Sequence, residues 1–136
     1  MNAGLLLLST IGLYISAYFT LVYYGIVKAD TKYVPAFCRM DEGSCMLIVH
    51  HSDAKVFGVP NALLGIAYYS CVLLFSVGVD GGVLLSGLIV SSLVAVILGV
   101  YLVYSLFVKL RVKCFLCLSS HGINMTIAFL LFVLLK

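Results

Sequence analysis

The sequence predicts an all-α membrane protein, a bundle of four transmembrane helices with a long redox loop between the first and second helices. Of its 136 residues, 64% are hydrophobic and 10% are charged, whereas soluble domains are about 45–50% apolar and about 25% charged. A soluble core of this size could not bury so many apolar side chains. The formal net charge of +3 is small and scattered along the chain, so we expect no nucleic-acid partner.

Four apolar runs are each long enough to cross the roughly 30 Å hydrocarbon layer as a helix, in which every backbone polar group is satisfied internally. They are Gly4–Val27, Val59–Val79, Val83–Val108 and Cys114–Leu135. The first run is too long for a signal peptide, has no basic segment before it, and is followed by no A-x-A cleavage site. We therefore expect a retained helix and one transmembrane domain over residues 1–136, in a multi-pass protein of the cell membrane.

The connections between these runs are unequal. A tight turn, Asp80–Gly82, joins the second run to the third, and Lys109–Lys113 joins the third to the fourth. The long connection, Lys28–Gly58, carries most of the chain's charge, two cysteines and two histidines. Loops of this length in compact domains are usually functional or disordered. Its apolar stretch Met46–Val49 is untypical of a disordered loop, so we expect a short helix on the membrane surface.

Four of the five cysteines are expected at one membrane face. An even number of spans places both chain ends on one side, so the long loop and the connection before the last span share the other side. Two cysteine pairs meet there: Cys38 and Cys45 in the loop, and Cys114 and Cys117 at the start of the last span. Cys71 lies inside the second span, where we expect a small buried hydrophobic residue.

The C-x-x-C spacing of Cys114 and Cys117 places both thiols on the same face of a helix, where they can close a disulfide or share one reaction. The positive end of the helix dipole, with Arg111 and Lys113 beside it, stabilises the thiolate, which is the reactive form. The alternative is a structural zinc site built from the four cysteines. Its other candidate ligands are His50, His51 and His121. The C-x6-C spacing of the loop pair is wide for a zinc knuckle, which disfavours this alternative.

These cysteine pairs, the segment Phe57–Asn61 (FGVPN) and Gly65 at the start of the second span together resemble the vitamin K epoxide reductase family, in its prokaryotic, quinone-linked form. The resemblance covers nearly the whole chain. Thiol oxidases of the DsbB type also have four spans and two cysteine pairs. In those proteins the C-x-x-C comes first and the wider pair follows, whereas here the order is reversed, which favours the first family.

The resemblance implies an enzyme, an oxidoreductase that acts on thiols with a quinone acceptor and drives protein disulfide formation. Electrons would pass from a thioredoxin-like protein, supplied as a separate chain, to Cys38 and Cys45, then to Cys114 and Cys117, and then to a quinone of the ubiquinone or menaquinone type. An accessible loop thiol suits exchange with a protein. A thiol at the membrane boundary suits the reduction of a lipid-soluble quinone.

The resemblance also implies quinone-binding roles for Asn61 and His121. The family has an asparagine at the place of Asn61 that hydrogen-bonds a quinone carbonyl, and the alternative role is a helix cap. Many relatives have a tyrosine where His121 stands, but a histidine can still donate to a quinone oxygen or move a proton; the alternative is a packing role. His121 and Asn124 continue the polar face of the C-x-x-C pair. His51 stands where most relatives have a serine, which leaves the control of Cys45 open.

The basic residues favour an active-site face in the cytoplasm. Seven of the eight Lys and Arg residues lie on the side of the cysteine pairs, and basic residues in short loops mark the cytoplasmic side. Most bacterial relatives have the reverse orientation, whereas members from hyperthermophilic archaea are inverted, as in this prediction. An alternative function is a non-catalytic membrane protein whose cysteines form structural disulfides or a zinc site.

Overall fold

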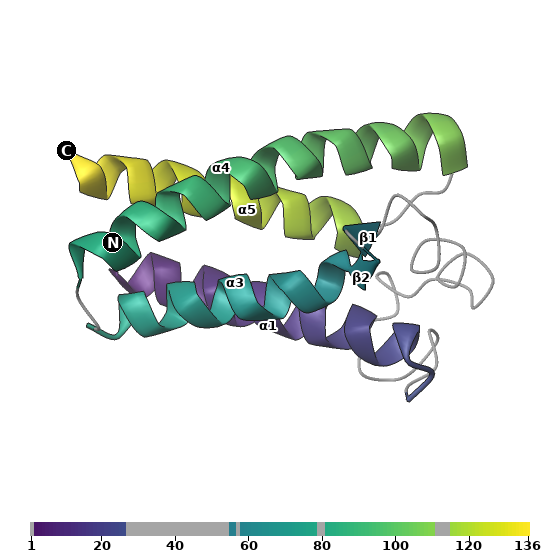
Figure 1. The fold of residues 1–136 in the computed structure, drawn as a ribbon, viewed down its shortest axis with the longest axis horizontal. Helices are drawn as coiled ribbons and strands as arrows, with labels where there is room; N and C mark the ends of the chain where they lie inside the picture. The colour runs from purple at the N-terminus through teal and green to yellow at the C-terminus, as the bar shows by residue number, and fades with distance from the viewer. Residues whose placement is uncertain (1, 27–54, 57, 79–80, 111–114) are drawn as a thin grey trace.

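The computed structural model describes residues 2–26, 55–56, 58–78, 81–110 and 115–136 (Figure 1). Its elements are α1 (Asn2–Tyr23), the short strands β1 (Lys55–Val56) and β2 (Val59–Pro60), α3 (Asn61–Ser76), α4 (Gly82–Tyr104), the π-helical segment η3 (Ser105–Leu110) and α5 (Phe115–Leu135). The two strands pair antiparallel. The predicted all-α class is confirmed. The predictions for Cys38, Cys45, Cys114 and the Met46–Val49 helix fall outside the described residues.

In the described part of the chain, three helices are long and apolar enough to cross a membrane. They cover Ala3–Tyr23, Gly82–Lys109 and Cys117–Leu135. The fourth, α3, is apolar but has only 16 residues, so at about 1.5 Å per residue it extends roughly 24 Å. That is shorter than the hydrocarbon layer of about 30 Å. The structure therefore shows a helical membrane protein with three helices of spanning length, and the crossing of α3 stays a prediction.

Local chemistry explains why α3 is shorter than the apolar run Val59–Val79. At its start, Pro60 is the N-cap residue, has extended backbone angles and belongs to β2. Proline disfavours a helical conformation in the residue before it and donates no backbone hydrogen bond, so the helix does not extend back to Val59. At its end, Gly78 has a φ of 101°. That left-handed conformation favours glycine and turns the chain out of the helix.

The helices α1, α3, α4 and α5 form a bundle in which each runs antiparallel to the next in sequence (Figure 1). The closest packing pairs α1 with α3 and α4 with α5, and the contact between α3 and α4 is slighter. Two glycines allow α1 and α3 to approach each other. A Cβ atom at Gly65 would lie 2.5 Å from Ser16 Oγ, and one at Gly12 would overlap the ring of Tyr69. Small residues serve this purpose at helix interfaces in membranes.

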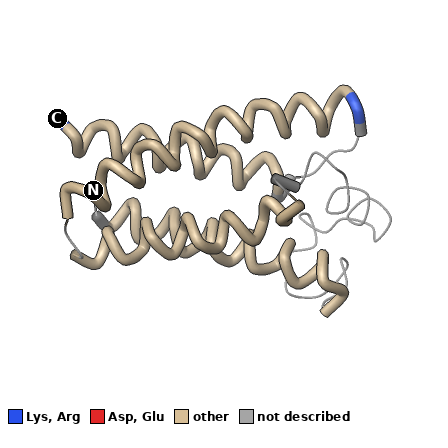
Figure 2. The backbone as a smooth tube through the Cα atoms, in the orientation of Figure 1, with Lys and Arg blue, Asp and Glu red and all other residues tan. Residues whose placement is uncertain are grey.

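Both chain ends lie at one end of the bundle, and the β1–β2 hairpin lies at the other (Figure 1). The hairpin end also holds the last turn of α1, the end of η3 and the start of α5. In the described part of the chain no Asp or Glu occurs, and the charged residues are Lys55, Lys109 and Lys136. Figure 2 shows Lys109 in blue at the end of η3, and Lys136 is the last residue, at the opposite end of the bundle. An uncharged middle between two basic ends is the distribution that a membrane requires.

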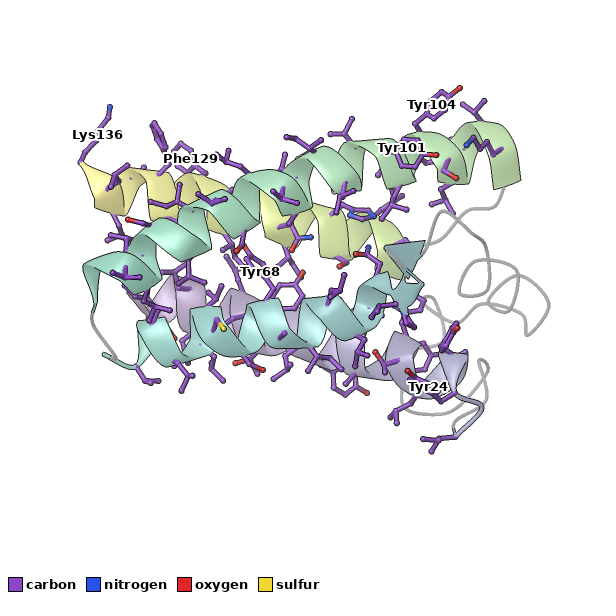
Figure 3. All side chains as sticks on the ribbon, in the orientation of Figure 1. Tyr24, Tyr68, Tyr101, Tyr104, Phe129 and Lys136 are labelled. Atoms are coloured by element: carbon purple, nitrogen blue, oxygen red, sulfur yellow. The ribbon has the colours of Figure 1, made fainter. Side chains whose placement is uncertain are left out.

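The bundle has a small core and a broad apolar exterior. The core cluster lies in the half of the bundle near the chain ends and consists of Leu5, Tyr69, Val72, Leu88, Ile127 and Leu131. Large apolar side chains are also exposed, among them Ile97 at 70% and Phe129 at 66%. Figure 3 shows Phe129 pointing away from the bundle. An exterior of this kind is suited to contact with lipid rather than water.

Candidate functional site

A cavity of about 800 Å³ lies between the helices, and α1, α3, α4, η3 and α5 all contribute to its wall. Its volume falls within the roughly 300–1,000 Å³ of ligand pockets. Most of the wall is apolar, and polar side chains are few. Three of them, Asn61, Cys117 and His121, were predicted as site residues from the sequence, and the structure places all three on this one wall.

Cys117 stands in the first turn of α5, half-buried and facing the cavity. It takes part in a disulfide. The positive end of the α5 dipole lies at this turn, where it would stabilise a thiolate once the disulfide is reduced. The structure thus places a sulfur atom of a disulfide on the wall of the cavity.

Cys71 differs from the prediction. It is a free, exposed thiol on α3 and is among the residues that line the cavity, whereas the sequence suggested a buried residue. The error has a simple cause, because an apolar side chain inside a membrane span is shielded from water by lipid and need not be covered by protein.

Asn61 is the first residue of α3 and is half-buried. The helix cap is Pro60, and no side-chain hydrogen bond is made there, so the structure gives no support to a capping role for Asn61. The hairpin before α3 holds the start of this helix at the same end of the bundle as Cys117 (Figure 1). The Asn61 amide is thereby placed where it can reach a polar atom of a ligand near Cys117.

His121 follows Cys117 by one helical turn, on the same face of α5. Its ring is half-buried, and its Nδ1 atom is buried without a hydrogen-bond partner among the described residues. The ring packs against Gly99 of α4 so closely that a Cβ atom at Gly99 would lie 2.9 Å from Nδ1. The contact with Gly99 joins two helices and could not be inferred from spacing in the sequence.

Two neighbouring tyrosines of α3 also line the cavity, and the sequence analysis missed both. The Tyr69 hydroxyl donates to Asn124 Oδ1 at 2.5 Å and lies 3.5 Å from Ser120 Oγ, which ties α3 to α5. Tyr68 points from α3 toward the α4–α5 pair (Figure 3). Its hydroxyl is buried without a hydrogen-bond partner in the described part of the chain. A buried phenol usually needs a hydrogen-bond partner. Two adjacent tyrosines inside an apolar run are therefore the one feature of the sequence that could have marked these residues as part of a site.

The zinc alternative is only partly tested by the structure. In the described ranges, no group of three His, Cys, Asp or Glu side chains is placed to hold a metal. Most of the candidate zinc ligands, including Cys38, Cys45 and Cys114, lie outside these ranges. Of the candidate ligands that are described, Cys117 is disulfide-bonded, and Nδ1 of His121 packs against Gly99 of α4.

A disulfide-bonded cysteine on the wall of a cavity inside an apolar helical bundle is a feature compatible with membrane oxidoreductases that act on thiols. The sequence matches the model of the vitamin K epoxide reductase family over residues 4–132. Because this match spans nearly the whole chain, the protein belongs to the vitamin K epoxide reductase family, as the sequence motifs predicted. A comparison with curated proteins finds no match.

Proposed function

We propose that the protein is a membrane thiol oxidase that takes electrons from a thioredoxin-like protein and gives them to a quinone, and so drives protein disulfide formation. The observation that carries the proposal is the position of the disulfide-bonded Cys117 on the wall of an apolar cavity of about 800 Å³. Membership of the vitamin K epoxide reductase family supports the same chemistry. In this proposal α3 also crosses the membrane, which brings the number of transmembrane helices to four. The loop after α1 carries the first cysteine pair.

The proposed electron path has three steps. A thiolate of the partner attacks the Cys38–Cys45 disulfide, and exchange leaves the partner oxidised and the loop pair reduced. Cys45 then attacks the disulfide of Cys114 and Cys117, which restores the loop disulfide and reduces the second pair. In the last step the Cys114–Cys117 dithiol closes its disulfide again and gives up two electrons and two protons, which convert a quinone to a quinol.

The residues around the cavity fit a quinone. The Asn61 amide and the His121 ring can donate hydrogen bonds to carbonyl oxygens, and both lie on the same wall as Cys117. The remaining wall is mostly apolar and suits a hydrophobic ring and its isoprenoid tail. Polar donors at one place in an otherwise apolar pocket fix the orientation of a ligand.

The proposal is tested with purified protein in lipid nanodiscs, by following the absorbance of ubiquinone-type and menaquinone-type analogues. The electron donors are a reduced thioredoxin-like protein and a small dithiol. Cys117→Ala is expected to abolish quinone reduction with both donors. Cys38→Ala is expected to abolish it with the protein donor alone, because a small dithiol can reach the second pair directly.

Two results would contradict the proposed function. If Cys38→Ala and Cys117→Ala lost the same activity with the small dithiol, the order of the relay would be wrong. If the unaltered protein reduced no quinone and held one equivalent of zinc by metal analysis, the cysteines would be structural instead.

We also propose that the hairpin end of the bundle faces the cytoplasm, because seven of the eight Lys and Arg residues belong to the two connections that the predicted topology assigns to that side, and basic residues in short loops mark the cytoplasmic side. Two sites test this with a membrane-impermeant thiol reagent on intact cells, in a background without native cysteines. A Cβ atom at Gly82 meets nothing within 4 Å, and Ile26 at the opposite end is 71% exposed. Labelling of Gly82→Cys and protection of Ile26→Cys are expected, and the reverse pattern would show that the bundle is inserted with its hairpin end outside.

A further inference from the structure

The contact between His121 and Gly99 fixes one edge of the imidazole ring. A Cβ atom at Gly99 would lie 2.9 Å from Nδ1, 3.5 Å from Cγ and 3.7 Å from Cβ of His121. Contacts below 3.0 Å are too short for a real side chain, so only glycine leaves this space to the ring. Gly99 is buried, and the backbone of α4 therefore forms the surface on which the imidazole rests.

The surroundings of Nδ1 also favour one position of the hydrogen on the imidazole ring. In a neutral imidazole one nitrogen carries a hydrogen and the other offers a lone pair. Nδ1 lies against α4 and has no hydrogen-bond partner among the described residues, so a hydrogen on Nδ1 would be a buried donor without an acceptor. A positively charged ring would also place an unpaired N–H group and a charge in the membrane interior, where both are costly. The neutral ring with a lone pair on Nδ1 and the hydrogen on Nε2 avoids both penalties.

The opposite edge of the ring is then the one that can serve a ligand. Nδ1 is buried without a partner among the described side chains, and the ring lines the cavity. A ring whose Nδ1 edge is held against α4 has Nε2–H as the polar group left to present to the cavity. That group donates one hydrogen bond and suits an acceptor such as a carbonyl oxygen.

We propose that Gly99 is a positioning residue for quinone binding: by having no side chain, it holds His121 with Nδ1 against α4 and Nε2–H toward a carbonyl oxygen of the ring. The inference rests on the proposed function in so far as the ligand is a quinone. It adds that His121 acts as a hydrogen-bond donor in a fixed tautomer, and that a residue on a different helix sets this geometry.

A glycine at position 99 lowers the stability of the helix that contains it. Glycine inside a helix costs about 1 kcal/mol relative to alanine in water, so Gly99 weakens α4 unless its missing side chain serves a contact. Gly122, the residue next to His121 on α5, gives the matched comparison. A Cβ atom there meets nothing within 4 Å, and Gly122→Ala makes the same chemical change without touching the imidazole.

The kinetic test measures kcat and KM for a short-chain ubiquinone analogue, with a small dithiol as donor. Gly99→Ala is expected to raise KM roughly three- to tenfold, the effect of one lost hydrogen bond, and Gly122→Ala is expected to leave it unchanged. His121→Ala should raise KM by a similar factor. The double variant Gly99→Ala/His121→Ala should be no worse than His121→Ala alone, because the two changes remove the same interaction.

Several results would overturn the inference. Additive increases in KM for the double variant would show that Gly99 acts only through helix packing, and an unchanged KM in Gly99→Ala would show that the contact has no role in binding. If Gly99→Ala does not fold, recovery of folding in the double variant is the expected result, since the ring that the new methyl group meets is gone. Failure of the double variant to fold would again mean a packing role.

A second measurement does not depend on quinone activity. Nitrogen-15 NMR of the histidine side chains, with His121 assigned from the spectrum of His121→Ala, reports which ring nitrogen carries the hydrogen. The Nε2–H tautomer is expected, and the Nδ1–H tautomer would contradict the inference. If the unaltered protein reduced no quinone while His121 showed the expected tautomer, the proposed function would fail and the geometry of the contact would stand.

Discussion

Helices α1 and α4 have similar lengths but play opposite parts in the bundle. Much of α1 is covered, with buried residues along most of its length, including Leu5, Ile15 and Val22. In α4 the buried residues are only Leu88, Ser92 and Gly99. The side of α4 that faces the bundle borders the cavity, and the side chains on its outer side are not covered by other helices. The comparison indicates that α1 and α3 form the scaffold and that α4 forms one wall of the cavity.

The two helices also use small residues differently. On α1, Gly12 brings the ring of Tyr69 into direct contact with the helix backbone, and this contact holds two helices together. On α4, a Cβ atom at Gly87 would meet nothing within 4 Å, whereas Gly99 receives the ring of His121. Glycine is therefore a packing device in α1, and in α4 it leaves space next to the cavity.

The largest effect on stability is expected from adding one methyl group to α1, and the same addition to α4 is the control. Gly12→Ala forces the new Cβ atom against the buried ring of Tyr69 and should lower the free energy of unfolding by about 1–3 kcal/mol, the usual range for overpacking. Gly87→Ala makes the same change in α4 and should be neutral or slightly stabilising. Unfolding in mixed detergent micelles measures both. Equal losses in the two variants would remove the distinction between scaffold and wall.

A smaller effect is expected from the hydrogen bond that connects the scaffold to α5. Tyr69→Phe removes the hydroxyl that donates to Asn124 Oδ1 and leaves that oxygen unpaired. Hydrogen bonds between helices in membranes are worth about 1 kcal/mol, and a loss of that size is expected in the same unfolding assay. Tyr104→Phe is the control, since Tyr104 is 53% exposed on the outside of α4. A loss as large in Tyr104→Phe would mean that the assay reports lipid contact instead.

Most of the fold could be predicted from the sequence because membrane spans have a physical minimum length. The apolar runs Gly4–Val27 and Val83–Val108 correspond closely to α1 and to α4 with η3. The second run was predicted too long, since hydropathy alone ignores Pro60 and Gly78, the residues that end the helix on either side. Both residues were visible in the sequence, and turn chemistry would have given the shorter helix.

The candidate site was predictable only in part. Cys117 and His121 could be placed on one face because their spacing matches one helical turn, and family resemblance added Asn61 on another helix. Contacts between helices leave no periodic trace, so Gly99 and the hydrogen bond of Tyr69 to Asn124 required the structure. Whether a side chain is covered by protein is equally invisible in a uniformly apolar run, and Cys71 was predicted to be buried for that reason.

The smallest expected effect has the opposite sign and comes from Tyr68, the neighbour of Tyr69. The two rings lie 5.2 Å apart, but Tyr69 bonds to α5 while Tyr68 faces the α4 side (Figure 3). Ser92 of α4 lies near the Tyr68 hydroxyl and makes at most a weak polar contact with it, because its own hydroxyl donates to the Ile89 carbonyl oxygen at 2.9 Å. Among the described residues, the Tyr68 hydroxyl on the cavity wall thus has no hydrogen bond of good geometry.

Tyr68→Phe removes this hydroxyl and keeps the ring. Because a buried polar group without a partner opposes folding, the free energy of unfolding should stay the same or rise by up to about 1 kcal/mol, where Tyr69→Phe lowers it. The same mixed-micelle unfolding assay measures both variants. A loss in Tyr68→Phe that disappears in a Ser92→Ala background would show that Ser92 accepts a hydrogen bond from Tyr68. In that case α4 would be tied to the scaffold by a polar contact, and the contrast between α1 and α4 would be weaker than the structure indicates.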